Sequence, residues 1–175
     1  MRFGSSVEFI IEAIKNSLNG VDENGIEDAI LNASRVTIYG VGRSGLVARS
    51  FATRLMHLGL ETYVIGETVS PPIEEGDVAI LISGSGKTNS VLRVGELARY
   101  IGVKVIAITS REDSPLCRMA DLGIILKVDI DRELAPLGTI FEDSAQIFLD
   151  GLVAELMGNL GESESSMSAR HATLE

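Results

Sequence analysis

Residues 36–45 read VTIYGVGRSG, a short β-branched and apolar run that leads into three glycines and a serine. Residues 77–88 read DVAILISGSGKT, so a second apolar run leads into another loop of glycine and hydroxyl residues. After each loop, apolar residues recur at intervals of three and four, which is the spacing of an amphipathic helix. A strand that passes through glycine into a helix is the repeating unit of parallel α/β sheets. The two stretches therefore predict a βαβ architecture.

Further apolar runs extend this architecture along the chain. Strands are expected at 36–39, 61–65, 77–82, 103–109 and 122–128. Because these runs alternate little between apolar and polar residues, they are typical of strands covered on both faces. Helices are expected at 45–58, 88–101, 115–120 and 139–157, and two more before the first strand, at 3–18 and after a plausible N-cap, Asp22. The expected fold class is α/β: a three-layer, doubly wound, five-stranded parallel sheet with N-terminal helices.

The length fits one domain. A chain of 175 residues is close to the usual size of about 150 residues per domain. We therefore interpret residues 1–175 as a single domain, with 1–34 as a helical lead-in and 161–175 as a tail rich in serine and glutamate that forms a short helix or frays. The helix at 139–157 is apolar on more than one side, which is typical of a deeply buried helix or a subunit contact. Oligomerisation is expected.

Composition excludes several classes of protein. The 15 Lys and Arg against 25 Asp and Glu give a net charge of −10, which opposes the phosphate-driven binding of nucleic acids. The longest stretch without a charged residue is nine residues, 78–86, whereas a membrane-spanning helix needs about 18 apolar residues. No secretory signal is expected at the N-terminus, and the single cysteine, Cys117, has no partner for an internal disulfide. A cytoplasmic protein without membrane or nucleic-acid partners is expected.

Two loops have the composition of an anion site. In open α/β sheets, ligands bind outside the carboxyl ends of the strands, where residues 40–45 and 83–88 are expected. Glycines expose backbone N–H groups at a helix N-terminus, and serine or threonine hydroxyls add donors. The alternative is that Ser44 and Thr88 only cap their helices. Two such loops at one sheet edge favour a phosphate ligand. The candidate binding residues are Arg43, Ser44, Ser83, Gly84, Ser85, Gly86, Lys87 and Thr88.

Other motifs account for these residues less well. The spacing Gly40-x-Gly42-x-x-Gly45 matches the dinucleotide fingerprint, with Glu67 near the end of the second strand as a ribose-binding acid. That interpretation leaves the loop at 83–88 unexplained. A nucleoside triphosphate loop is excluded because Leu81 stands where its first glycine is required. No group of residues has metal-ligand spacing, and no GxSxG elbow is present.

The candidate acid–base residues are few. Thr139 followed by Glu142 has the spacing of a capping box, in which the carboxylate bonds a backbone N–H, but Glu142 also opens onto the edge of the sheet that carries the two loops. From spacing alone, the capping box is the commoner outcome. His57 is expected to be a last-turn cation or a core histidine, and His171 lies in the tail.

Five segments together are similar to one known family. They are GVGRSG (40–45), RLMHLGLETYVIGET (54–68), SGSGKT (83–88), PLGTIFEDSAQIFLD (136–150) and RHATLE (170–175). They resemble the 6-phospho-3-hexuloisomerase family, compact members of the sugar isomerase (SIS) superfamily. The resemblance implies a flavodoxin-like sheet, a homotetramer with active sites shared between subunits, and no cofactor or metal. It implies conversion of 3-hexulose 6-phosphate to fructose 6-phosphate in the ribulose monophosphate pathway, which fixes formaldehyde.

The resemblance also implies roles for individual residues. Ser44 and residues 83–88 match the sugar-phosphate loops, and Glu142 matches a proposed proton-transfer base, which now favours catalysis over capping. His171 is expected to reach the active site of a neighbouring subunit. Glu67 and Glu133 have no comparable support. Three alternatives stay open: another SIS isomerase, acting on arabinose 5-phosphate or a heptose phosphate; a non-catalytic sugar-phosphate sensor; and the dinucleotide-binding interpretation given above.

Overall fold

The computed structural model describes residues 2–128 and 131–173, and its centre is a parallel sheet of five strands in the order β2-β1-β3-β4-β5. The strands are β1 (Val36–Gly40), β2 (Thr62–Val64), β3 (Val78–Ile82), β4 (Lys104–Thr109) and β5 (Leu122–Ile125). The expected five-stranded parallel sheet is confirmed. β2 and β5 are shorter than their apolar runs, because each lies at an edge and pairs with one neighbour only.

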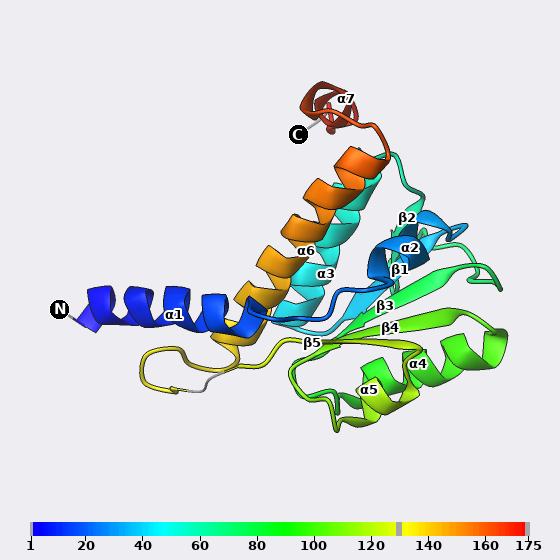
Figure 1. Cartoon of the computed structure of the whole chain (residues 1–175). Coiled ribbons are helices and arrows are strands. Elements are labelled where there is room, and N and C mark those ends of the chain that lie inside the picture. The colour runs from blue at the N-terminus through cyan, green and yellow to red at the C-terminus, as the bar shows by residue number, and fades with distance from the viewer. Residues whose placement is uncertain (1, 129–130, 174–175) are drawn as a thin grey trace.

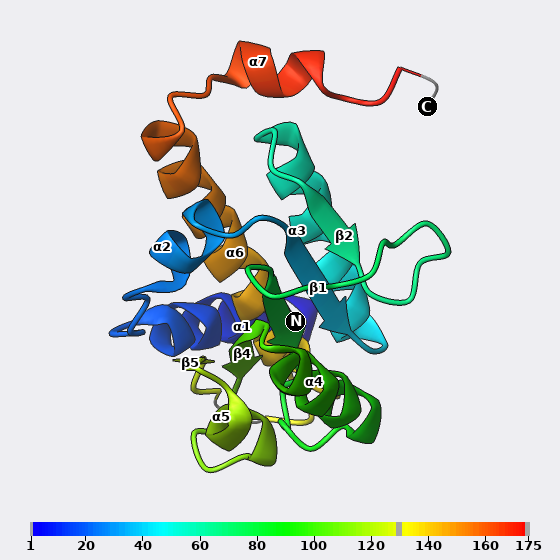
Figure 2. The ribbon, with the colours of Figure 1, turned by 90° about the vertical axis from the view of Figure 1, so that its right-hand side faces the viewer.

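Helices cover both faces of the sheet (Figures 1 and 2). α2 (Ile26–Leu31), α3 (Arg43–His57) and α6 (Thr139–Asn159) lie on one face, and α4 (Asn89–Ile101) and α5 (Pro115–Met119) lie on the other. Alternate residues of β3 show why two layers are needed: Ile80 packs under α3 and α6, whereas Leu81 packs under α4 and α5, and both are fully buried. Burying such a side chain stabilises the fold by about 1.5–3 kcal/mol.

Two helices lie outside the three layers. α1 (Arg2–Leu18) contacts α6 and extends away from the sheet (Figure 1). α7 (Glu164–Ala169) forms from the tail and packs against α3. Arg170 fastens it there, since its guanidinium donates to the Glu162 carboxylate at 2.8 and 2.9 Å and to the backbone oxygen of His57. The last two residues of the closing segment 170–175 lie outside the described residues.

One local prediction is wrong. Asp22 does not cap α2, which begins after Gly25 in the left-handed conformation with no side-chain cap. The Asp22 carboxylate accepts instead from the backbone and side chain of Asn24, because a turn separates it from the helix. Within the described residues, no helix combines the length and apolar composition that crossing a membrane requires.

Candidate functional site

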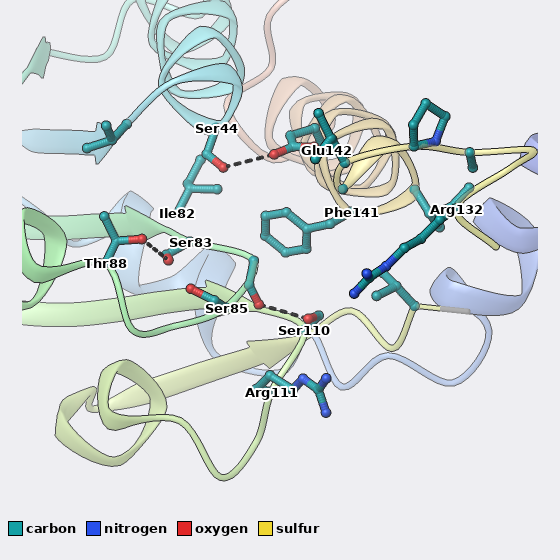
Figure 3. A pocket seen from close by; sticks show the side chains of 18 residues that line it. Ser44, Ile82, Ser83, Ser85, Thr88, Ser110, Arg111, Arg132, Phe141 and Glu142 are labelled. Atoms are coloured by element: carbon teal, nitrogen blue, oxygen red, sulfur yellow. Dashed lines mark hydrogen bonds between the residues drawn. The ribbon is translucent and has the colours of Figure 1, made fainter. Parts of the chain in front are cut away.

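A cavity of about 770 Å³ opens at the carboxyl edge of the sheet. The loops that follow β1, β3, β4 and β5 contribute its walls, so segments far apart in sequence meet there (Figure 3). Its lining residues are Val41, Ser44, Ile82, Ser83, Gly84, Ser85, Thr88, Ser110, Arg111, Val128, Arg132, Ala135, Pro136, Leu137, Gly138, Ile140, Phe141 and Glu142. This is the position where parallel α/β sheets bind ligands.

The loop between β3 and α4 forms one wall and is tied down at several points. The Ser83 N–H donates to the Ile108 oxygen of β4, and the Gly86 N–H donates back to the Ser83 oxygen. The Ser110 hydroxyl donates to the Gly84 oxygen at 2.8 Å. The Ser83 and Thr88 hydroxyls lie 3.0 Å apart. The loop therefore holds its hydroxyls and N–H groups in a fixed arrangement.

The capping interpretation of the loop hydroxyls is wrong. Thr88 is the N-cap of α4, but its side chain makes no capping hydrogen bond and contacts Ser83 instead. Ser44 lies inside α3, which begins after Gly42, and its hydroxyl donates to Glu142 Oε1 at 3.4 Å. Both hydroxyls line the cavity, so they are placed to meet a ligand.

Glu142 lies in the first turn of α6, across the cavity from the loop between β3 and α4. Its Oε2 accepts from the Arg43 guanidinium at 2.8 Å, and its side chain is 18% exposed. The capping box is not formed, because Gly138 is the N-cap and the Thr139 hydroxyl donates to the Pro136 oxygen. The carboxylate is therefore directed toward Arg43 and Ser44, which follow β1.

Two effects oppose each other on the pKa of Glu142. Burial raises it by penalising the charged carboxylate, and this effect prevails, so the pKa lies above its ordinary value. The Arg43 charge, the backbone N–H of Glu142 and the Ser44 hydroxyl lower it in part. A pKa shifted in this direction makes the carboxylate a stronger base than an exposed glutamate, which favours a role in general acid–base catalysis.

Some of the expected site residues line the cavity and others do not. Ser44, Ser83, Gly84, Ser85, Thr88 and Glu142 line the cavity. Arg43 does not, because its guanidinium binds Glu142 and the Leu137 oxygen. Gly86 is a buried residue of the loop at 83–88 and Lys87 is an exposed one, and neither lines the cavity.

The two histidines meet each other elsewhere. His171 follows α7 and stacks on His57 with ring centroids 5.3 Å apart, and it does not line the cavity of its own chain. Within the described residues, no three His, Cys, Asp or Glu side chains gather as metal ligands would.

Several lining residues were not anticipated from sequence, among them Ser110, Arg111, Arg132 and Phe141. Ser110 and Arg111 directly follow β4, so the rule for carboxyl ends of strands could have indicated them. Arg132 lies in the loop after β5, where no pattern distinguishes it from a solvated arginine. Phe141 resembles any apolar residue of α6, yet its ring lies against Gly84, where an added Cβ would come within 2.9 Å.

Comparisons with known proteins agree with this architecture. A family model described as the SIS domain matches residues 29–145. A Methanocaldococcus jannaschii protein named 3-hexulose-6-phosphate isomerase is 48% identical over 147 residues, which are 84% of this chain and 81% of that protein. A Bacillus subtilis protein of the same name is 32% identical over 185 residues and 100% of both chains.

A solved structure shows the same fold. A Methanococcus jannaschii protein, whose crystal structure was described as inferring the molecular function of a 3-hexulose-6-phosphate isomerase, is 42% identical with a TM-score of 0.87. The match covers 98% of each chain. The chain therefore belongs to the SIS domain family, as a phosphosugar isomerase of the 6-phospho-3-hexuloisomerase group that its motifs resemble.

Proposed function

We propose that this isomerase converts 3-hexulose 6-phosphate to fructose 6-phosphate through an enediol. The observation that carries the proposal is the position of Glu142, a partly buried carboxylate that faces the hydroxyl-rich loops across one cavity. The names of the relatives supply the substrate class.

The phosphate binds the loop at 83–88, with the Ser83, Ser85 and Thr88 hydroxyls and the N-terminus of α4 as donors. Ser44 contributes from the other loop. Anchoring the phosphate there directs the sugar carbons toward α6. The substrate's C2 and C3 then lie beside Glu142.

The ionised Glu142 removes the proton from C2, and the electron pair of that C–H bond forms the C2–C3 double bond of a 2,3-enediol. The oxygen at C3 gains a proton and the oxygen at C2 loses one, after which Glu142 returns its proton to C3. One carboxylate serves both transfers. A hydrogen-bond donor beside the enediolate stabilises its charge or moves a proton between the two oxygens, a role we assign to His171 of a neighbouring subunit. Lys87, the other candidate from sequence, does not line the cavity of its own chain.

The quaternary structure, the cellular compartment and the pathway are part of the same proposal. We place the enzyme in the cytoplasm, in the ribulose monophosphate pathway, as a homotetramer with active sites shared between subunits. Phe3, Val7 and Ile11 support an oligomer, because they recur every four residues on α1 and remain exposed. Native mass spectrometry measures the assembly, and a monomer would contradict shared sites.

The decisive experiment replaces Glu142 with Gln. A coupled assay follows fructose 6-phosphate formed from enzymatically made hexulose phosphate, with arabinose 5-phosphate offered as a rival substrate. We expect kcat to fall by at least about a hundredfold, the usual contribution of a general base. Calorimetry should show fructose 6-phosphate still binding.

The matched control is Glu96→Gln, which removes an exposed carboxylate on α4 that pairs with Arg93. This variant should retain full activity. Full activity in Glu142→Gln would reject the assignment of the base, and turnover of arabinose 5-phosphate alone would reject the proposed substrate.

A further inference from the structure

A phosphate ester brings more charge than the hydroxyl loops can balance. It carries about −1.5 to −2 at pH 7, whereas the hydroxyls and N–H groups of residues 83–88 are neutral donors. The protein itself carries −10. The two cations expected from sequence do not line the cavity: Arg43 is bound to Glu142, and Lys87 lies outside. A cationic side chain at the cavity would add to the partial positive charge that the N-terminus of α4 supplies.

Arg111 and Arg132 are the cationic side chains that line the cavity among the described residues. Neither guanidinium has an ion pair or hydrogen bond in the described part of the chain. Most other arginines there are paired with carboxylates: Arg35, Arg43, Arg49, Arg54, Arg93, Arg99 and Arg170. The cavity therefore holds two guanidinium groups whose donors are available.

Local hydrogen bonds hold Arg111 at one rim. Its backbone N–H donates to the Thr109 hydroxyl at 3.3 Å, and its oxygen accepts from the Ser114 N–H at 3.1 Å. The preceding Ser110 bonds the Gly84 oxygen, which joins this turn to the loop between β3 and α4. The backbone of Arg111 therefore lies directly beside the proposed phosphate loop.

A second turn holds Arg132 at the other rim. The Asp131 carboxylate accepts from the N–H groups of Glu133 and Leu134 at 2.9 and 3.2 Å, and the Asp131 oxygen accepts from the Ala135 N–H at 2.8 Å. In Figure 3, Arg132 extends from the loop before α6 toward the side of the cavity where Ser110 and Arg111 lie. The two cations belong to different loops and converge on one region.

We propose that Arg111 and Arg132 bind the outer oxygens of the substrate phosphate from two rims of the cavity, and so determine its preference for a dianionic phosphate monoester. This inference rests on the proposed function for the identity of the substrate. The hydroxyl loop supplies geometry, and the guanidiniums supply charge and paired N–H donors, which suit phosphate oxygens. An unphosphorylated ketose would leave both cations without a partner.

The test combines Arg111→Gln, Arg132→Gln and the double variant with measurements of KM, kcat, the inhibition constant of inorganic phosphate, and the calorimetric Kd of fructose 6-phosphate. A hydrogen bond to a charged group contributes about 1.5–3 kcal/mol, which corresponds to roughly a 10- to 100-fold change. We expect each single variant to raise KM, Kd and the phosphate inhibition constant about tenfold, with kcat within about threefold.

Two controls separate charge from folding. Arg93→Gln removes an exposed guanidinium on α4, outside the cavity, and should leave every constant unchanged. Arg111→Lys and Arg132→Lys keep the charge without the planar fork, so they should restore part of the lost phosphate affinity. Phosphate affinity equal to that of the unaltered protein in a folded double variant would overturn the inference.

Binding and turnover fail separately in this design. If the unaltered protein binds inorganic phosphate and fructose 6-phosphate but isomerises neither hexulose phosphate nor arabinose 5-phosphate, the proposed function fails. Weaker binding of phosphate in the arginine variants would still support this inference. If Glu142→Gln abolishes turnover but the double arginine variant binds phosphate normally, the proposed function stands and this inference is overturned.

Discussion

Gly86 is the position in the phosphate loop where a single methyl group should have the largest effect. Its φ is +60°, and a Cβ added there would lie 2.2 Å from Ser114 Oγ, 2.4 Å from Ser114 Cβ and 3.0 Å from Thr109 Oγ1. The left-handed backbone costs an alanine about 1–2 kcal/mol, and overpacking a closed site costs about 1–3 kcal/mol. Gly86→Ala should therefore lower the free energy of unfolding by about 2–5 kcal/mol.

A second substitution divides this loss between its two causes. Ser114→Gly removes the crowding atoms, and glycine at this N-cap of α5 costs only a few tenths of a kcal/mol. In urea unfolding, the variant that combines Gly86→Ala with Ser114→Gly should recover the part of the lost free energy of unfolding that is due to crowding. The part that is due to the left-handed backbone should remain. Gly25→Ala is the matched control, because its φ is +87° and nothing lies within 4 Å of the added Cβ. If Gly86→Ala is no less stable than Gly25→Ala, or if Ser114→Gly gives no relief, the steric argument is refuted.

Two further predictions concern ionisable groups. Arg43→Met removes a charge that lowers the pKa of Glu142, so that pKa should rise and the acidic limb of kcat/KM should move to higher pH; a limb that stays in place would contradict the pairing. Arg170 lowers the pKa of Glu162 to about 2, so its contribution to holding α7 is present above the ordinary value of 4.5 and disappears as pH falls from there toward 2. The protection of the Met167 N–H against hydrogen exchange should therefore fall below about pH 4, and in Glu162→Gln it should be low already at neutral pH. Equal protection in Glu162→Gln and the unaltered protein at neutral pH would contradict the role of the Arg170–Glu162 pair in holding α7.

The predicted sheet followed from information that is local in sequence. Strands such as β3 are apolar along their whole length, and an unbroken apolar run must be covered on both faces. Gly40 and Gly42 mark the turn into α3, because the first would clash with the backbone of Ser44 if it carried a Cβ. Such signals do not depend on contacts with distant segments.

The misassigned caps show where local reasoning ends. Thr139 and Glu142 have the spacing of a capping box, but an oxygen of Glu142 finds a cationic donor 99 residues away in Arg43. A charged hydrogen bond of this kind outweighs a neutral cap. Spacing cannot reveal that competitor, because it belongs to another loop.

The sequence by itself determined the parallel α/β architecture and the two hydroxyl loops at its carboxyl edge, since periodicity and glycine placement express short-range sterics and solvent exposure. Only the tertiary structure decided how the charges are shared: Arg43 turns to Glu142, and Arg111 and Arg132 remain available at the cavity. The physical reason is that Coulomb interactions depend on distance in space, and residues from four loops become neighbours only after the sheet has brought the ends of its strands together.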